Sequence, residues 1–301
     1  MATRETVGFI GLGRMGRPMA SNLARKQLPP SVYDLNDKAM AAVEELGGKR
    51  AANAAALAQS SSVLITMLPG PSGVESVLIG ADGAMAKMKP GGLVMDMSTV
   101  LPETSDKLAA EAKARGLGFV DAPVGRLASH AERGECLFMV GASGADFARV
   151  KPLLEAMGTT IHHCGGPGTG TRTKLVNNLL AICLCLMNGE ALTLTRQFGL
   201  DIQTTLDVLH GTTATNGQLK INLPSKVFKG DTEPGFAIDL AHKDLSLIVE
   251  SANRARVPLP MVAAARESLS LARAGGYGGK DFSAFLDFWC ERAGAEKVRL
   301  G

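Results

Sequence analysis

A lysine followed by two asparagines is the group in this sequence best suited to chemistry. Asn177 and Asn178 follow Lys174 at the third and fourth positions, so all three share one face of a helix. The apolar run 179–187 comes next, and polar groups beside a buried run are costly unless they are paired or used. An amine partly withdrawn from water releases its proton more readily, so Lys174 could exchange a proton with an alcohol while Asn178 holds it. The same segment also fits a non-catalytic interpretation, in which an exposed lysine and two surface asparagines lie at the start of a helix.

A glycine-rich turn near the start of the chain supplies a second functional pattern. Gly11, Gly13 and Gly16 follow the short apolar run 7–10 and open a helical pattern. In such a turn the first glycine permits a tight bend, the second lets the backbone approach a pyrophosphate, and the third allows close helix–strand packing. The free N–H groups of the helix start would hold the phosphates. The predicted dinucleotide-binding segment is Gly11, Leu12, Gly13, Arg14, Met15 and Gly16.

An acidic residue indicates which dinucleotide binds. Asp34 comes directly after the next apolar run, 31–33. It is followed by Leu35 and Asn36 rather than by basic residues. A carboxylate there accepts hydrogen bonds from a ribose 2′-hydroxyl and repels a 2′-phosphate. The sequence therefore predicts NAD, with NADH preferred over NADPH.

The elements that must position these residues change character after residue 164. Short apolar runs alternate with helical stretches in the first part, which predicts a mostly parallel sheet with helices on both faces. After the glycine-rich segment 164–168 only helical patterns follow, beginning with 169–198, a stretch that would span ~45 Å. We therefore expect two domains, 1–164 binding the dinucleotide and 165–301 all-helical, carrying the substrate and dimerisation surfaces. The strands are expected at 7–10, 31–33, 63–67, 93–97, 118–121, 137–140 and 160–162.

Composition limits the classes of function. Among 301 residues, 46% are hydrophobic and 20% charged, which suits a folded core, and a net charge of +3 is too weak to indicate nucleic acid. The five cysteines are odd in number and lack a Cys-x-x-Cys pair, which indicates reduced thiols in a cytoplasmic protein. The start at Met1–Glu5 leaves no room for a signal peptide, and the run 179–187 is too short to cross a membrane. The five histidines show no metal-ligand spacing, so no metal is expected.

The motifs, taken together, resemble those of the β-hydroxyacid dehydrogenases, which include 3-hydroxyisobutyrate dehydrogenase. This resemblance implies a Rossmann-type doubly wound α/β domain followed by an all-α domain like that of 6-phosphogluconate dehydrogenase. It rests on segments spread over nearly the whole chain: 8–23, 67–69, 96–99, 121–124, 168–178 and 243–245.

The resemblance also implies roles for single residues. Lys174 would be the catalytic acid and base, and Asn178 its positioning partner. Asn177 would contact the substrate. Ser98 would contact either the substrate or the nicotinamide. Met67, Leu68 and Thr99 would line the cofactor, and Lys243 would close over both ligands.

One turn departs from the family pattern. The family has Asp-Ala-Pro-Val-Ser-Gly-Gly, whereas this chain has Gly125 and Arg126 after the shared Asp-Ala-Pro-Val. A guanidinium there would add a fixed charge and several donors to the anion pocket, which suits a sulfonate. This turn resembles that of the 3-sulfolactaldehyde reductases within the family. It implies NADH-dependent reduction of 3-sulfolactaldehyde to 2,3-dihydroxypropane-1-sulfonate.

Two alternatives remain. A carboxylate substrate is the first: 3-hydroxyisobutyrate, serine, or tartronate, succinate or methylmalonate semialdehyde. The second is a non-catalytic dinucleotide-binding interaction module, which the retained Lys174 disfavours. The expected partners are a small anionic substrate and further copies of the chain, as a homodimer or homotetramer, without nucleic acid or membrane.

Overall fold

The computed structural model describes residues 5–300, so the expectation about the first residues of the chain lies mostly outside the described part. The chain forms two compact units, Met1–Lys174 and Leu175–Gly301. The predicted boundary at 164–165 precedes the long helix α8 (Thr169–Gln197), and the compact units divide within that helix.

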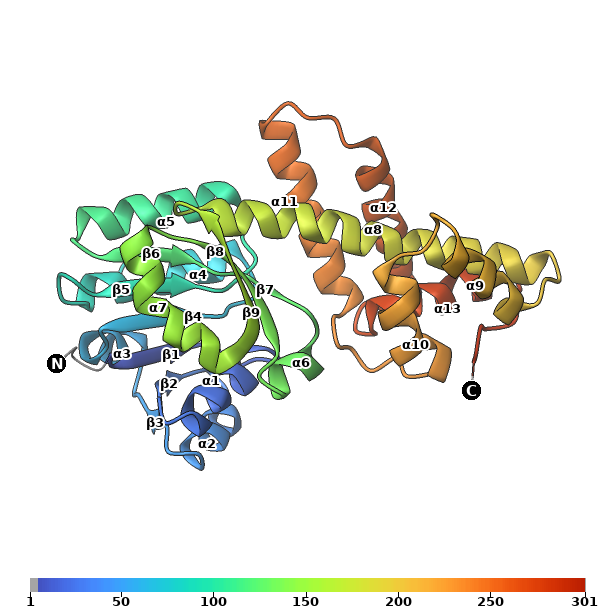
Figure 1. Ribbon diagram of the computed structural model, residues 1–301. Coiled ribbons are helices and arrows are strands. Elements are labelled where there is room, and N and C mark those ends of the chain that lie inside the picture. Colours follow the sequence, from blue (N-terminus) through green and yellow to red (C-terminus); the bar gives the residue numbers. More distant parts are fainter. Residues whose placement is uncertain (1–4, 301) are drawn as a thin grey trace. The chain divides into compact units, whose positions relative to one another are not determined.

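A nine-stranded sheet forms the centre of the first unit (Figure 1). Its order is β3-β2-β1-β4-β5-β6-β8-β7, with β9 beside β8, and the pairs from β3 through β6 are all parallel. Strand β8 is antiparallel to β6 and β7 and parallel to β9, so the prediction of a mostly parallel sheet is confirmed. The strands are β1 (Val7–Ile10), β2 (Ser31–Tyr33), β3 (Lys49–Arg50), β4 (Val63–Thr66), β5 (Leu93–Asp96), β6 (Gly118–Asp121), β7 (Val124–Gly125), β8 (Cys136–Gly141) and β9 (Gly158–Gly165).

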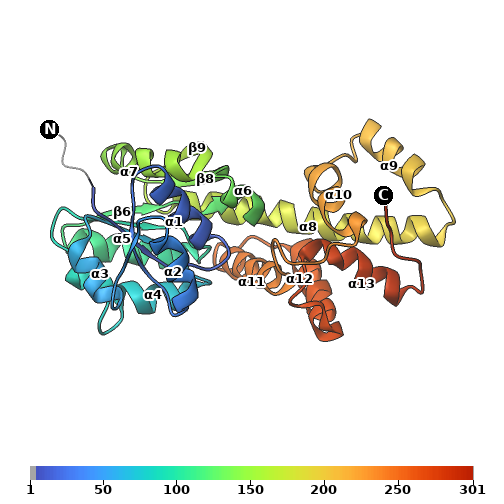
Figure 2. The same ribbon diagram turned by 90° about the horizontal axis from the view of Figure 1, so that it is seen from below.

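Helices cover both faces of this sheet because successive strand side chains point to opposite sides. Phe9 of β1 belongs to one buried cluster with side chains of α1, α2 and α7, whereas Ile10 belongs to a second cluster with side chains of α3, α4 and α5. Figure 2 shows the helices of the first unit from below. The helices are α1 (Gly16–Arg25), α2 (Asp37–Glu44), α3 (Ala54–Ser60), α4 (Pro71–Ile79), α5 (Pro102–Ala114), α6 (Ala128–Glu132) and α7 (Gly144–Met157), with a 3₁₀ turn at Ala84–Lys87.

Two strands, β3 and β7, and two helices, α3 and α6, of the first unit were not expected from the sequence. Strand β3 is a two-residue edge strand with both residues exposed, so it carries no apolar pattern. Helix α3 lies in an alanine-rich stretch with few periodic apolar residues, and it is held by its N-cap, because Asn53 accepts a hydrogen bond from the Ala56 N–H.

The second unit is helical, and the described residues 175–300 contain no strand apart from one isolated bridge between Ala237 and Asp281. Buried aromatic residues such as Phe285 pack beside α8, where a side chain on Gly189 would lie 3.2 Å from the Phe285 ring. The helices after α8 are α9 (Ile202–Gly211), α10 (Leu223–Ser225), α11 (Ile238–Arg254), α12 (Pro260–Ala272) and α13 (Phe285–Arg292), with short π and 3₁₀ turns at Gln218–Asn222, Val227–Lys229, Arg273–Tyr277 and Phe282–Ala284.

Helix α8 is 29 residues long. By length and composition it could cross a membrane, which the uninterrupted run 179–187 alone did not suggest. Leu186 and Leu192 of this helix are buried in the protein, and 44% of its most apolar window is buried.

Candidate active site

The candidate site of the first unit lies at the carboxyl edge of the parallel sheet. The order of strands reverses direction between β1 and β4, and in open α/β sheets ligands bind outside the carboxyl ends of strands at such a point. The loops that follow β1, β4 and β5 carry the glycine-rich turn, Met67–Leu68 and Ser98–Thr99. The fold therefore gathers the predicted cofactor residues at one edge.

The three glycines of the turn have different surroundings. Gly11 has φ +94°, and a Cβ there would lie 2.3 Å from the Met67 carbonyl oxygen. A Cβ on Gly16 would lie 1.9 Å from the Gly11 carbonyl oxygen, so this glycine is needed for helix–strand packing. Gly13 is exposed and would meet no heavy atom within 4 Å. Packing within the protein therefore does not require a glycine at position 13. A glycine there is consistent with a ligand that approaches the backbone closely.

Asp34 directly follows β2 and is joined to the glycine-rich turn by a hydrogen bond. One carboxylate oxygen accepts a hydrogen bond from the Leu12 N–H at 2.6 Å, and the other accepts one from the Asn36 N–H at 2.7 Å. Each oxygen keeps a second lone pair for a hydroxyl donor. The carboxylate thus fixes the shape of the glycine-rich turn as well as the charge beside it.

Ser98 holds the cofactor-side loop after β4. Its hydroxyl accepts a hydrogen bond from the Leu68 N–H at 2.9 Å and donates its single hydrogen to Asp96 at 2.6 Å. The side chain is 1% exposed, whereas the next residue, Thr99, is half-buried. Ser98 therefore has no hydrogen left to donate to an anionic substrate.

Asp96 was not singled out from the sequence. It is buried at the end of β5, where one oxygen accepts hydrogen bonds from the hydroxyls of Ser98 and Thr66 and from the Ser98 N–H. Burial raises the pKa of Asp96, and those hydrogen bonds oppose the shift. The carboxylate ties the ends of β4 and β5 together. Its position two residues before Ser98 is the sequence feature that could have identified it.

Lys174 lies against the turn that follows β6. Its Nζ donates a hydrogen bond to the Val124 carbonyl oxygen at 2.6 Å, and the contact is buried. The next residue, Gly125, is buried in β7. Lys174 is therefore not an exposed surface lysine, and its amine lies against the Asp-Ala-Pro-Val segment at 121–124.

Arg126 begins beside this contact, but its guanidinium reaches other groups of the first unit. It donates hydrogen bonds to the Glu135 carbonyl oxygen at 2.6 Å and to the hydroxyls of Thr159 and Thr160 at 3.1 and 3.0 Å. Its backbone has φ +72°, a conformation that favours glycine, which the family pattern has at this position. These contacts show a structural role for the side chain that the sequence did not predict.

Asp121 opens the same turn and was not assigned a role from the sequence. Its two carboxylate oxygens accept hydrogen bonds from the N–H groups of Gly168 and Thr171, each at 2.6 Å. Burial raises the pKa of Asp121 to about 6, although the two N–H donors oppose the shift. The sequence feature that could have identified Asp121 is the segment 121–124, which is part of the family resemblance.

The second unit brings together four other polar residues, Asn177, Asn178, Lys243 and Asp244. The Asn178 side chain donates to one oxygen of Asp244 at 2.6 Å, and the Lys243 amine forms an ion pair with the other at 2.8 Å. Asn177, which is exposed, donates to the Asn178 side-chain oxygen at 3.0 Å. Asp244 is buried and joins two predicted site residues. The sequence marked its motif without giving this residue a role.

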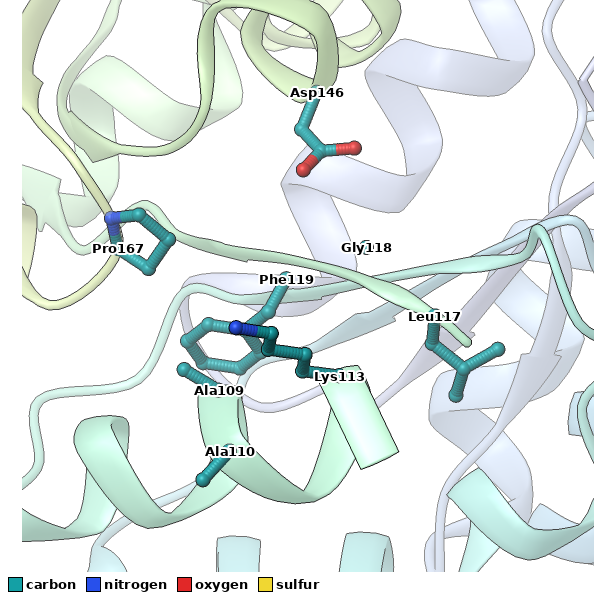
Figure 3. A pocket seen from close by; sticks show the side chains of 8 residues that line it. All are labelled: Ala109, Ala110, Lys113, Leu117, Gly118, Phe119, Asp146 and Pro167. Carbon is teal, nitrogen blue, oxygen red and sulfur yellow. The ribbon is translucent and has the colours of Figure 1, made fainter. Parts of the chain in front are cut away.

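A further groove in the first unit is lined by residues of α5, β6 and α7 and by Pro167 (Figure 3). Lys113 and Asp146 lie on its two sides, and Phe119 lies between them. None of the predicted site residues lines this groove. Among the described residues 5–300 no three His, Cys, Asp or Glu side chains form a group that could hold a metal ion.

The chain resembles known enzymes over nearly all of its length. Residues 6–166 match the NAD-binding domain of 6-phosphogluconate dehydrogenase, and residues 168–289 match the NAD-binding domain of NADP-dependent 3-hydroxyisobutyrate dehydrogenase. A 3-sulfolactaldehyde reductase of Escherichia coli is 41% identical over 281 residues, which are 93% of this chain and 94% of that protein. A 2-(hydroxymethyl)glutarate dehydrogenase of Eubacterium barkeri is 37% identical over 96% of both chains.

A solved structure gives the same result for the fold. A 3-hydroxyisobutyrate dehydrogenase of Salmonella typhimurium superimposes with a TM-score of 0.83 at 32% identity, covering 94% of this chain and 99% of that one.

Fold, site and relatives together define an oxidoreductase that uses a nicotinamide dinucleotide and acts on alcohol and aldehyde groups. The chain belongs to the β-hydroxyacid dehydrogenase family, as the sequence motifs indicated.

Proposed function

We propose that this enzyme reduces 3-sulfolactaldehyde to 2,3-dihydroxypropane-1-sulfonate with NADH, and that Lys174 is its general acid. The observation that carries the acid role is the buried hydrogen bond from the Lys174 amine to the Val124 carbonyl oxygen. The substrate is supported by the 41% identity to a 3-sulfolactaldehyde reductase and by the arginine in the turn that Lys174 contacts.

The residues present fit a dinucleotide. The bare position of Gly13 leaves room for the pyrophosphate, and Asp34 keeps lone pairs for ribose hydroxyls while repelling a 2′-phosphate. When bound, the reduced nicotinamide supplies the hydride. We propose Gly11–Gly16, Met67, Leu68, Thr99 and Lys243 as the remaining cofactor-binding residues.

Lys174 supplies the proton in this proposal. As an ammonium it stabilises the negative charge that grows on the aldehyde oxygen and then donates a proton to it, which leaves a neutral amine that solvent reprotonates. Oxidation of the alcohol needs the neutral amine first, so that direction is favoured by alkaline pH. Asn178 is proposed to orient the amine.

The anionic tail needs donors, and the proposed substrate-binding residues differ in what they offer. Arg126, Asn177, Lys243 and the Gly125 N–H can donate hydrogen bonds. Ser98 gives its hydrogen to Asp96, so we propose that it acts by holding Leu68 on the cofactor side. An arginine suits a sulfonate because each sulfonate oxygen is a weak acceptor and gains most from a full positive charge.

A carboxylate substrate is the second candidate, and one observation favours it. The donors of Arg126 are already used by Glu135, Thr159 and Thr160, so an anion must compete with them. Relatives named for carboxylate substrates, such as 3-hydroxyisobutyrate dehydrogenase, are 33–36% identical to the chain.

Steady-state kinetics decide between the candidates. We expect kcat/KM to be highest for 3-sulfolactaldehyde with NADH, compared with succinic and tartronate semialdehydes and with NADPH. Arg126→Gly should lower kcat/KM for the sulfonate by about tenfold or more, and for the carboxylates by less than about threefold, since a charged hydrogen bond contributes ~1.5–3 kcal/mol.

Arg133→Ala is the matched control, because it removes a nearby exposed guanidinium that is paired with Glu135. Arg133→Ala should leave kcat/KM unchanged for the sulfonate and for the carboxylates. Equal losses for sulfonate and carboxylates in Arg126→Gly would instead support the carboxylate candidate.

We also propose that the enzyme is a cytoplasmic homodimer or homotetramer. Helix α8 exposes apolar side chains at helical spacing, including Val176, Leu180, Met187 and Leu194, which a second copy would cover. All five cysteines are free, as expected in a reducing compartment. A monomer by light scattering would contradict the oligomer.

A further inference from the structure

The start of α8 is fixed to the first unit by one buried carboxylate. Asp121 is fully buried, and each of its two oxygens accepts a hydrogen bond from a backbone N–H of the segment that begins this helix, Gly168 and Thr171. The N–H groups of a first helical turn lack partners within the helix, and an acceptor from outside the helix satisfies them. A carboxylate at this end also interacts favourably with the helix dipole.

Further contacts restrict the same turn to one position. The hydroxyls of Ser105 and Thr171 form a buried hydrogen bond of 2.8 Å. A Cβ on Gly170 would lie 2.2 Å from the Met139 carbonyl oxygen and 2.6 Å from that of Asp121, both backbone atoms that cannot easily move. The helix start therefore lies directly against β6 and β8 with no room to shift.

Lys174 lies on α8 three residues after Thr171, and its Nζ donates a hydrogen bond to the Val124 carbonyl oxygen at 2.6 Å. Asp121 and Val124 belong to the same short segment, so one segment holds both the helix backbone and the amine. A shift or rotation of the helix start would move the amine relative to that carbonyl group.

We propose that Asp121 is a positioning residue for the reaction, which acts by fixing the start of α8 and so the place of the Lys174 amine. The inference rests on the proposed role of Lys174 as general acid. It adds to that role a second residue that contacts neither substrate nor cofactor.

A double-mutant cycle tests the inference. Asp121→Asn keeps the side-chain size but replaces one accepting oxygen with an N–H group that faces a backbone N–H. We expect the single-turnover rate of NADH oxidation to fall about 10- to 100-fold, because small misplacements of a catalytic group have effects of this size. In a Lys174→Met background the same substitution should change the residual rate by less than about threefold, since the positioned amine is gone.

A purely structural residue would behave differently in this cycle. It would lower the rate by the same factor in both backgrounds, and that result would overturn the inference. If Lys174→Met alone leaves the rate unchanged, the acid role of Lys174 fails, and the inference about Asp121 that rests on it fails as well; an equal loss in both backgrounds overturns only the inference. The dissociation constant of NADH, measured by fluorescence titration, should stay within about twofold in Asp121→Asn.

Two further variants keep the test informative. Asp201→Asn makes the same change at the N-cap of α9, where Asp201 accepts a hydrogen bond from the Thr204 N–H, and it should not alter the rate. If Asp121→Asn does not fold, Ser105→Ala removes the other polar tether of the same turn. It should lower the rate about threefold in the wild-type background and not in Lys174→Met; an equal loss in both would overturn the inference.

Discussion

Two turns of the first unit, the glycine-rich turn at 11–16 and the turn at 121–127, show different relations between sequence and chemistry. The first acts through backbone: Gly11 and Gly16 are required by packing, and Gly13 is bare. The second acts through side chains and one carbonyl group, since Asp121 binds the start of α8 and Val124 accepts from Lys174. Substitutions in the first turn should therefore impair ligand binding at Gly13 and packing at Gly16, whereas a substitution of Asp121 in the second turn should impair the placing of the Lys174 amine.

The largest effect on stability is expected at Asp121 and depends on pH. At low pH the carboxyl is protonated in folded and unfolded chains alike. As the pH rises the unfolded chain loses this proton near 3.8, whereas the folded protein keeps it until about 6. Folding is therefore favoured at low pH, and between pH 4 and 7 the wild type should lose about 2 to 2.5 kcal/mol relative to Asp121→Asn.

Urea unfolding at pH 4.5, 5.5 and 7 measures this difference. Circular dichroism is the suitable probe, because the single tryptophan, Trp289, lies in the second unit. Other carboxylates titrate in both proteins and cancel. A difference between the two proteins that does not change with pH would show that the Asp121 carboxyl is not held neutral by burial.

The next effect sharpens the description of the glycine-rich turn. Gly13→Ala should weaken NADH binding by about tenfold or more while leaving the melting temperature unchanged, because its Cβ meets no protein atom but would occupy ligand space. Gly16→Ala should destabilise the protein by about 1–3 kcal/mol, because its Cβ overlaps a backbone oxygen. Equal losses of stability in the two variants would remove the distinction between the glycines.

A smaller effect is expected at Asp34. Asp34→Ala should raise the KM for NADH about fivefold, since a hydrogen bond contributes ~1 kcal/mol, and should reduce the preference over NADPH. The measurement is kcat/KM for both dinucleotides. An unchanged ratio would contradict the proposed choice of cofactor by this carboxylate.

The two turns also show what the sequence can predict. Gly11, Gly13, Gly16 and Asp34 were found because a backbone motif needs fixed residue types at fixed spacing. The direction of the Arg126 side chain was not found, because it depends on Thr159 and Thr160, more than thirty positions further along the chain.

The buried acids show the same limit. Asp96 joins Thr66 to Ser98, Asp121 binds Gly168 and Thr171 about fifty positions further along the chain, and Asp244 binds Asn178, which lies 66 positions earlier. Their motifs were visible, but their partners are set by the packing of strands and helices. The parallel sheet and the helical second unit were predictable because apolar periodicity is a local property.

The most direct test of the account is the rate of hydride transfer in Lys174→Met. With saturating aldehyde, stopped-flow absorbance of bound NADH should show oxidation slowed by about 10²–10⁴-fold, the usual contribution of a general acid, while NADH binds as tightly as to the wild type. A transient rate within about threefold of the wild type would contradict the assignment of Lys174 as the proton donor.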